Sequence, residues 1–262
     1  MVEFVTSAAN PLLKEIRRAV SQGGLTRQGW CIAESFHLLD EALRSGRAVE
    51  AIVAAQSALD ALEARNARVR TVAVPDALFQ SISATENAQG VMALLAPPQW
   101  EWEQLLSQRA LLLILDGVQD PGNAGTMLRA AEAFGASGAI FLKGAVSPYN
   151  PKTLRASAGS IFRVPLLNGM DASVVNEVLR ASKARIYAAA PYRNDASSAL
   201  TKVDLTESCA LAIGNEARGL SAEMRSAARE ISIPTAGVES LNAAMAASIL
   251  LYEARRQRSL VA

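Results

Sequence analysis

Three polar segments of this chain carry side chains that could bind or position a ligand. Each segment follows a run of apolar residues that is typical of a buried strand. In parallel α/β sheets, ligands bind where loops leave the carboxyl ends of the strands. The three segments therefore predict one binding site. Its polar side chains are an amide and a guanidinium in the first segment, an amide and a carboxylate in the second, and a hydroxyl and an amide in the third: Asn123, Arg129, Asn215, Glu216, Ser240 and Asn242.

Each of these residues also has a purely structural interpretation. A serine or asparagine at a helix start accepts hydrogen bonds from free backbone N–H groups, so Asn123, Ser240 and Asn242 could be helix caps. Arg129 lies off the apolar face of its predicted helix and could be a solvated cation. Glu216 could accept hydrogen bonds from a ligand or cap the following helix. Spacing alone leaves both interpretations open.

The glycines of the first segment do not form a known phosphate-binding motif. Gly117 and Gly122 have the spacing of a P-loop, but Asn123-Ala124 follows where a lysine and a hydroxyl residue are required. The chain contains neither G-x-G-x-x-G nor G-x-S-x-G. These features argue against an unrelated nucleotide-binding enzyme of the P-loop or dinucleotide-binding type.

Composition narrows the class of protein. His37 is the only histidine, so a histidine-rich metal site is excluded and no metal cofactor is expected. A formal charge of +1 neither demands nor excludes a nucleic-acid partner. Cys31 and Cys209 lie in apolar runs and are interpreted as reduced core residues, which is typical of a cytoplasmic protein. The start of the chain lacks the apolar region of a signal peptide, and no apolar run approaches the ~18 residues of a membrane span.

The order of apolar runs and helical patterns predicts two α/β domains. Residues 1–96 form the smaller one, and residues 97–109 form a linker in which Trp100 and Trp102 dock onto the second domain. Residues 110–262 form the larger one. Its first strand is a near-continuous apolar run, as in a parallel sheet with helices on both faces. One helix is expected from about Asn123 to Phe134, and another around residues 151–162.

Taken in order, the three polar segments resemble the signature motifs of a known enzyme family. They read N-x-G-x-x-x-R from Asn123, I-G-N-E-x-x-G-L from Ile213, and I-P-x5-S-L-N-x9-Y-E from Ile233. This ordered set resembles the SpoU (TrmH-type) RNA ribose 2′-O-methyltransferases of the SPOUT superfamily, and the resemblance covers the second domain. The first domain is similar to the substrate-binding domain that precedes the catalytic domain in many members.

The resemblance implies a fold and a cofactor. Residues 110–262 would form a parallel-sheet α/β domain tied in a deep trefoil knot, preceded by a smaller α/β RNA-binding domain like that of a ribosomal protein. Members bind S-adenosylmethionine, need no metal, and dimerise through the knotted domain. Carried over to this chain, the cofactor would contact Gly214, Asn215, Ile233 and Leu241.

The resemblance also implies roles for the polar side chains. The substrate-handling residues correspond to Asn123, Arg129, Glu216, Ser240 and Asn242. The reaction is displacement at a methyl sulfonium by a ribose hydroxyl, which must lose its proton. In the family, Arg129 would activate that hydroxyl. Because a guanidinium is essentially never deprotonated, Arg129 could instead clamp a phosphate and stabilise the alkoxide, and both roles stay open.

The family analogy points to RNA contacts at Asn10, Lys14, Arg27 and Arg155. Ordinary surface polarity is the alternative for all four, and Asn10 could also cap a helix. Three positions depart from the family pattern, none of them proposed as catalytic. Ala244 stands where a small hydroxyl residue is usual, Ser35 where glycine is common, and Ala88 where proline is frequent.

These observations predict an S-adenosylmethionine-dependent enzyme that methylates ribose 2′-hydroxyls in structured RNA, with ribosomal RNA favoured. We expect a cytoplasmic homodimer that does not associate with membranes. The alternatives are a transfer-RNA 2′-O-methyltransferase and a non-catalytic RNA-binding or ribosome-assembly protein on the same fold. Methyl transfer to ribosomal and transfer RNA separates the three.

Overall fold

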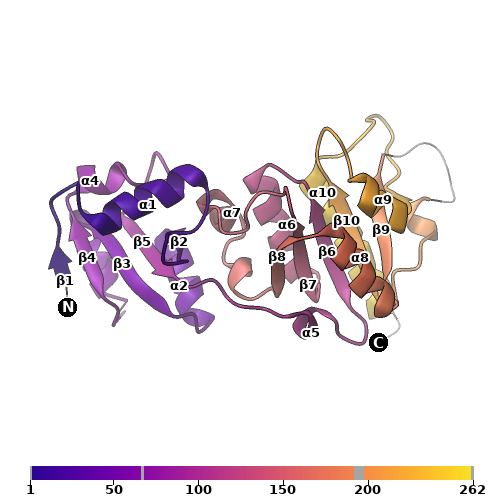
Figure 1. Cartoon of the computed structure of the whole chain (residues 1–262), viewed down its shortest axis with the longest axis horizontal. Coiled ribbons are helices and arrows are strands. Elements are labelled where there is room, and N and C mark those ends of the chain that lie inside the picture. Colours follow the sequence, from indigo (N-terminus) through magenta and orange to yellow (C-terminus); the bar gives the residue numbers. More distant parts are fainter. Residues whose placement is uncertain (1, 66–67, 192–197, 261–262) are drawn as a thin grey trace. The chain divides into compact units, whose positions relative to one another are not determined.

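The computed structural model describes residues 2–65, 68–191 and 198–260. They form two compact units (Figure 1). Unit 1 contains Met1–Gln99 and Tyr149–Arg163, and unit 2 contains Trp100–Pro148 and Val164–Ala262. The 149–163 segment thus belongs to unit 1, although it lies inside the range expected for the second domain. The chain therefore passes between the two units at three places along the sequence.

Unit 1 is built on a five-stranded mixed sheet with the order β1-β4-β3-β5-β2. Strands β1, β4 and β3 run parallel, whereas β5 is antiparallel to both β3 and β2. Strand β1 and helix α3 were not expected from the sequence, because each is too short to show a periodic pattern. The elements are β1 (Val2–Phe4), α1 (Pro11–Gln22), β2 (Cys31–Glu34), α2 (Phe36–Arg44), β3 (Val49–Ala55), α3 (Leu59–Glu63), β4 (Thr71–Val74), α4 (Asp76–Gln80), β5 (Val91–Leu95) and α7 (Pro151–Ala156).

Helix α1 shows how local sequence sets an element of unit 1. The Asn10 side chain accepts hydrogen bonds from the backbone N–H groups of Leu12 and Leu13, and Pro11 supplies a fixed φ at the first helical position. The helix ends at Gly23, whose φ of 63° is the left-handed conformation that glycine adopts without strain. The predicted cap at Asn10 is confirmed.

The helix expected around residues 151–162 is interrupted. Helix α7 ends at Ala156, and only a short 3-10 turn, Ser160–Phe162, follows it. The break falls at Gly159, whose φ is +92°. A β-carbon at Gly159 would lie 2.5 Å from Cγ of Glu41, so the chain passes helix α2 at a distance that only glycine permits. Glu41 also pairs there with Arg163.

Unit 2 is built on a six-stranded sheet with the order β11-β9-β10-β6-β7-β8, in which every neighbouring pair is parallel. This arrangement confirms the parallel α/β sheet expected for the larger domain. The elements are α5 (Trp102–Leu105), β6 (Leu111–Asp116), α6 (Pro121–Ala133), β7 (Gly138–Leu142), β8 (Leu166–Met170), α8 (Ala172–Ala181), β9 (Arg185–Ala190), β10 (Cys209–Gly214), α9 (Ala222–Ala227), β11 (Arg229–Ser232) and α10 (Ala243–Ser259).

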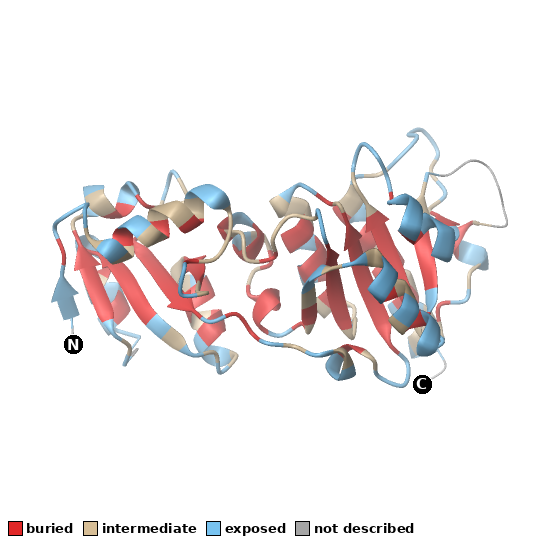
Figure 2. Ribbon diagram, in the orientation of Figure 1, coloured by how far each residue is buried: buried red, intermediate tan, exposed pale blue. Residues whose placement is uncertain are grey.

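The central strands of unit 2 are buried because helices cover both faces of the sheet (Figure 2). All six residues of β6 are buried, as its continuous apolar run predicts. Helix α8 packs against α9 and β9, while α10 packs against α6 and β10. Trp100 and Trp102 lie against the core of unit 2, so the docking role predicted for them is confirmed.

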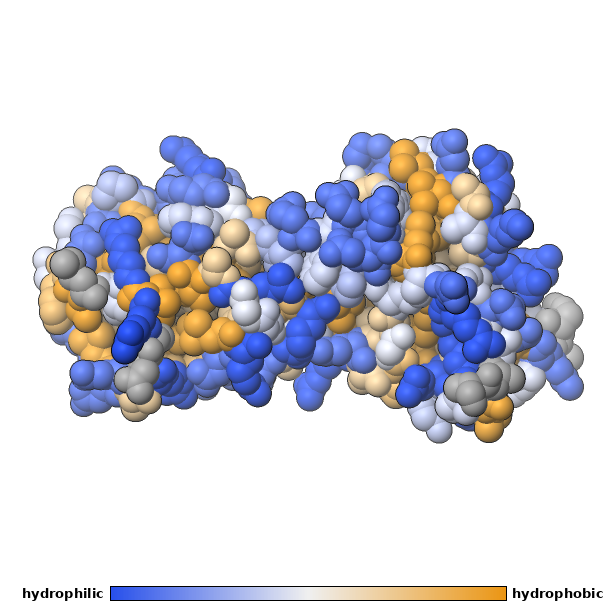
Figure 3. All heavy atoms as spheres, turned by 90° about the horizontal axis from the view of Figure 1, so that it is seen from below, coloured by the Kyte–Doolittle hydropathy of each residue, from blue (hydrophilic) through white to orange (hydrophobic). Residues whose placement is uncertain are grey.

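The surface of the molecule is mixed in character. On the face shown in Figure 3, hydrophilic side chains cover much of both units, and hydrophobic groups reach the surface in patches. Among the described residues, no helix combines the length and apolar character that crossing a membrane requires.

Candidate active site

Two of the polar segments leave the sheet side by side. Strands β6 and β10 are parallel neighbours, with Asp116 opposite Gly214 at their carboxyl ends. The segment that leads into α6 and the 215–219 loop therefore begin from adjacent positions. This is the strand-end location at which parallel sheets bind ligands, as the sequence predicts.

The 215–219 loop is a tight turn closed by its own backbone. The N–H of Asn215 donates to the Gly219 carbonyl at 2.9 Å, and the N–H of Gly219 donates to the Asn215 carbonyl at 2.9 Å. Gly219 has a φ of +70°, and a β-carbon on Gly214 would lie 2.3 Å from the Gly219 carbonyl carbon. Both glycines of this motif are therefore required by the shape of the turn.

Asn215 stabilises this turn from within. Its Nδ2 donates to the Gly117 carbonyl at 2.9 Å, while its Oδ1 accepts from the N–H groups of Ala217 and Arg218 at 3.0 Å each. With these partners, the amide links the two neighbouring strand ends. We expect Asn215 to act on a bound cofactor through the shape of this loop.

Asn123 lies between the other two motifs. Its Nδ2 donates to Oε1 of Glu216 at 3.2 Å, and its Oδ1 accepts from Nδ2 of Asn242 at 3.1 Å. The interpretation of Asn123 as a helix cap is wrong: helix α6 begins two residues earlier, and Asp120 caps it by accepting from the Asn123 N–H at 2.6 Å. The Asn123 side chain is consequently available to join the three motifs.

Asn242 both caps a helix and joins this network. Its Oδ1 accepts from the backbone N–H groups of Ala244 and Met245 at the start of α10, at 2.9 and 3.2 Å. Its Nδ2 is left to reach Asn123. Glu216 does not cap the following helix, because the Ser221 side chain does so. Ser240 is exposed and makes no hydrogen bond with the described residues.

A pocket of about 680 Å³ lies beside this network, lined by the carboxyl ends of β9, β10 and β11, by the segments that follow them, and by residues of α9 and α10. Its volume lies within the range of ~300–1,000 Å³ typical of small-molecule sites. Seven residues predicted for the site line the pocket: Gly214, Asn215, Glu216, Ile233, Ser240, Leu241 and Asn242.

The lining fits the cofactor that the sequence implies. Apolar side chains of Ile213, Leu220, Ile231 and Leu241 provide surface for an adenosine, and the backbone of the 215–219 loop provides polar groups. Carboxylates of Glu216, Glu230 and Glu239 line the same pocket and suit a positively charged sulfonium. Within the described part of the chain, no cluster of three or more His, Cys, Asp or Glu residues could hold a metal ion.

Arg129 stands apart from the pocket. It lies on the exposed side of α6, does not line the pocket, and its guanidinium makes no hydrogen bond or ion pair with the residues that the structure describes. The structure thus brings Asn123 and the residues of the second and third motifs together, but leaves Arg129 facing solvent.

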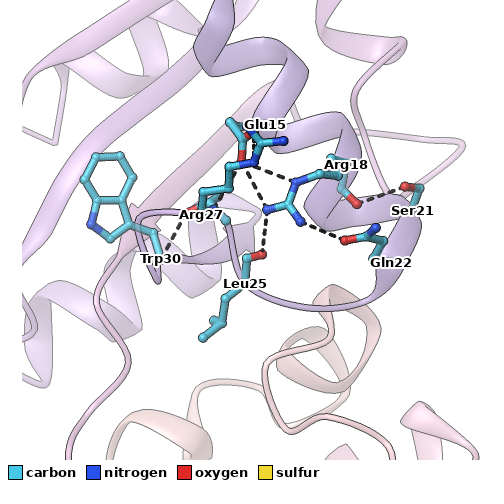
Figure 4. Close-up of polar contacts among 8 residues, drawn as sticks. Glu15, Arg18, Ser21, Gln22, Leu25, Arg27 and Trp30 are labelled. Carbon is cyan, nitrogen blue, oxygen red and sulfur yellow. Dashed lines mark hydrogen bonds and ion pairs between the residues drawn. The ribbon is translucent and has the colours of Figure 1, made fainter.

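The residues predicted for RNA contact lie in unit 1. Asn10 caps α1, and Lys14 is exposed on the same helix without a polar partner among the described side chains. Arg155 is exposed on α7. Arg27 is 76 % exposed and lies 3.3 Å from the Glu15 carboxylate, which Arg18 also contacts at 3.1 Å (Figure 4).

Sequence reasoning missed part of the pocket wall. Residues 188–191 line it, as do Arg225, Glu230 and Thr235. The 188–191 segment could have been found, because it is the carboxyl end of β9, the parallel neighbour of β10. Arg225 and Glu230 belong to none of the three motifs, and nothing in their spacing points to a ligand.

Two protein-family models and a characterised relative match most of this chain. The model of the SpoU rRNA Methylase family matches residues 110–252, and the model of the MRM3-like substrate binding domain matches residues 10–93. The 23S rRNA (guanosine(2553)-2′-O)-methyltransferase RlmP of Bacillus subtilis is 32% identical over 96% of this chain and 98% of its own length.

Solved structures show the same fold. The AdoMet-bound rRNA methyltransferase from Sinorhizobium meliloti has a TM-score of 0.82 and is 28% identical, covering 97% of this chain and 98% of its own. The SpoU methyltransferase AviRb from Streptomyces viridochromogenes has a TM-score of 0.81 and is 26% identical, covering 96% and 99%. The expected fold class, a SPOUT-type α/β domain preceded by a substrate-binding domain, is confirmed.

Proposed function

The chain belongs to the SpoU rRNA methylase family, and from this premise we propose that it methylates a ribose 2′-hydroxyl of ribosomal RNA with S-adenosylmethionine. One observation carries the proposal. A hydrogen-bonded network of Asn123, Glu216 and Asn242 joins all three motifs at the edge of a pocket sized for a nucleoside. Isolated helix caps would not converge on one another beside a pocket.

The chain's own residues supply binding, orientation and proton handling. S-adenosylmethionine, when bound, provides an electrophilic methyl group on a positively charged sulfur. Gly214, Ile233 and Leu241 are the pocket residues that would hold it. Glu216 uses Oε1 to bind Asn123, and its Oε2 has no hydrogen-bond partner among the described residues, which leaves that oxygen to accept a hydrogen bond from a ribose hydroxyl and to take its proton as the methyl group is transferred. Fixed geometry of this kind lowers the entropic part of a reaction barrier.

Arg129 fits the role of an electrostatic clamp better than that of a base. A guanidinium keeps its charge in proteins and binds phosphate through two parallel hydrogen bonds. An exposed guanidinium that has no partner among the described residues is available to an RNA phosphate. We assign it to the phosphate beside the target ribose, where its charge would also stabilise the forming alkoxide.

A homodimer is part of the proposal. Met245 and Tyr252 are 56% and 55% exposed on α10, seven residues apart and therefore on one side of the helix. The Tyr252 ring contacts Phe134 at the end of α6 with a centroid separation of 5.7 Å. A partner copy seated on this apolar stripe would bury both exposed side chains.

The RNA surface of unit 1 completes the proposal. Lys14, Arg27 and Arg155 are exposed cations within this unit, and Arg17 and Arg18 lie on α1 with Lys14. Basic side chains gathered on one module supply the sequence-independent part of RNA affinity.

Transfer of a tritiated methyl group tests the function. Purified protein is incubated with labelled S-adenosylmethionine and either ribosomal or transfer RNA, and the RNA is digested to nucleosides to locate label on the 2′-oxygen. We expect incorporation into ribosomal RNA. Label in transfer RNA alone would show that the substrate is transfer RNA and not ribosomal RNA. Cofactor binding without incorporation into either RNA would indicate a non-catalytic RNA-binding protein.

A further inference from the structure

Two ionic side chains of opposite charge line the pocket outside the three motifs. Arg225 lies on α9 and Glu230 on β11, and both are part of the pocket wall. They are not paired with one another, and Glu230 makes no hydrogen bond or ion pair with any residue that the structure describes. A ligand that carries both charges would complement this wall.

Arg225 is held against the pocket by the chain itself. Its Nη2 donates to the Leu220 carbonyl at 3.0 Å, and Leu220 lines the pocket as well. The same nitrogen would lie 3.6 Å from a β-carbon placed on Gly219. The guanidinium therefore sits at the end of the 215–219 loop. Since a guanidinium has five N–H donors, this contact leaves donors free for a carboxylate.

Arg218 is the other arginine of the wall, and it differs from Arg225 in one respect. Its backbone N–H is bound by Asn215, but its guanidinium has no polar partner among the described residues. Ordering a free arginine side chain on a ligand costs conformational entropy that a pre-ordered guanidinium does not lose. The anchored group, Arg225, is the better carboxylate receptor.

We propose that Arg225 and Glu230 bind the amino-acid end of the cofactor, Arg225 its α-carboxylate and Glu230 its α-ammonium. The inference rests on the proposed function, because it takes S-adenosylmethionine as the ligand. Arg225 lies at the end of the 215–219 loop, and Glu230 lies on β11, where it is paired in register with Ala188 of the pocket wall. They act as positioning residues that fix one end of the cofactor.

Binding of three probes by titration calorimetry tests the assignment on the full-length protein. S-adenosylhomocysteine carries the whole amino acid, decarboxylated S-adenosylmethionine keeps the ammonium but lacks the carboxylate, and 5′-methylthioadenosine lacks both. Arg225→Gln should lower the affinity for S-adenosylhomocysteine about tenfold, because hydrogen bonds to charged groups contribute more than hydrogen bonds between neutral groups. It should leave the affinity of the other two probes unchanged within about twofold. Glutamine at this position keeps an N–H donor but removes the charge.

Glu230→Gln should give a different pattern. It should lower the affinity for both probes that carry the ammonium and leave the affinity for 5′-methylthioadenosine unchanged. Arg218→Gln is the matched control for Arg225→Gln, since it removes the same charge from the same pocket. Glu223→Gln is the control for Glu230→Gln, since it removes a carboxylate from an exposed position of α9 outside the pocket lining. Neither variant should discriminate among the probes.

Two results would overturn the inference. One is an equal loss for all three probes in Arg225→Gln, which would mean that Arg225 only shapes the 215–219 loop. The other is a loss of affinity for S-adenosylhomocysteine alone, the probe that carries the carboxylate, in Arg218→Gln and not in Arg225→Gln. Failure of the wild-type protein to bind S-adenosylhomocysteine is a separate outcome and would contradict the proposed function itself.

Discussion

Asn242 and Asn123 lie 119 positions apart in the chain and are joined by a hydrogen bond of 3.1 Å between Nδ2 of Asn242 and Oδ1 of Asn123. Asn123 in turn donates to Glu216. Because a side-chain amide has a donor and an acceptor on one planar group, it can accept from one neighbour while it donates to the other. Asn123 thus sets the distance between the second and third motifs.

Replacing Asn123 should impair transfer much more than folding. In Asn123→Ala, Glu216 and Asn242 lose the group that fixes their separation, while Asp120 still caps α6. We expect kcat/KM to fall about 10²-fold, the usual effect of misplacing reacting groups by about 1 Å. Thr126→Ala, on an exposed position of the same helix, is the control and should retain full activity. If S-adenosylhomocysteine affinity falls as much as transfer, the network maintains the pocket and not the substrate geometry.

Gly214 should tolerate no side chain. A β-carbon there would lie 2.3 Å from the Gly219 carbonyl carbon and 2.4 Å from the Leu220 nitrogen, both of them backbone atoms. Gly214→Ala should therefore cost about 1–3 kcal/mol of stability and open the cofactor loop. Gly24→Ala is the matched control, because a β-carbon at Gly24 meets nothing within 4 Å. Chemical denaturation and S-adenosylhomocysteine titration measure both effects. An unchanged midpoint in Gly214→Ala would show that the turn can relax.

The sequence predicted that the three motifs form one site at the carboxyl ends of the strands, but it could not assign a function to each side chain. The pattern at Asn123 allowed either a helix cap or a ligand contact. In the structure Asp120 is the helix cap, because α6 starts two residues earlier than its apolar face suggests. At Asn242 the two interpretations were not exclusive, since one amide oxygen caps α10 while the nitrogen reaches Asn123. Such pairings depend on tertiary contacts between distant positions, which periodicity does not encode.

Other features were outside the reach of sequence patterns for different reasons. The 149–163 segment joins unit 1 through contacts such as the pair of Arg163 with Glu41, which are more than 100 positions apart. Arg225 and Glu230 have the appearance of ordinary surface charges on a short helix and a short strand. Only the pocket shows that they face the same space.

Arg129 should matter to transfer and not to cofactor binding. Because it lies outside the pocket, Arg129→Ala should leave S-adenosylhomocysteine affinity nearly unchanged. We expect kcat/KM to fall about 10²- to 10³-fold, as when one electrostatic stabiliser of a transition state is removed. Arg129→Lys distinguishes clamp from base: a clamp predicts partial activity with the wild-type pH profile. A new alkaline ionisation in that profile would instead show that the residue at this position exchanges a proton.

The proposed homodimer should depend on the apolar stripe of α10. A charge at Met245 or Tyr252 would have to be desolvated at the interface, so Met245→Asp and Tyr252→Asp should yield monomers in light scattering at micromolar concentration. Val174→Asp is the control: it places the same charge on an exposed apolar position of α8 and should remain dimeric. Wild-type protein that is monomeric under these conditions would remove the dimer from the proposal.

Glu15 should limit RNA binding by unit 1. Partial desolvation raises the pKa of its carboxyl, but hydrogen bonds from the Arg27 backbone and the Arg18 guanidinium outweigh it, so the pKa lies below the ordinary 4.5. A lowered pKa keeps Glu15 charged as the pH falls toward that value, and Arg18 and Arg27 stay paired throughout the neutral range.

Glu15→Gln should therefore leave the positive charges of Arg18 and Arg27 without a compensating carboxylate and make them available to RNA phosphates. We expect tighter binding and a salt dependence of log K that steepens by about one for each additional phosphate contact. Filter binding at several salt concentrations measures both quantities. Glu63→Gln, which removes the same charge from an exposed position of α3, controls for net charge. If it raises affinity as much as Glu15→Gln does, only the overall charge of unit 1 matters. If Glu15→Gln leaves both affinity and salt slope unchanged, Arg18 and Arg27 do not contact RNA.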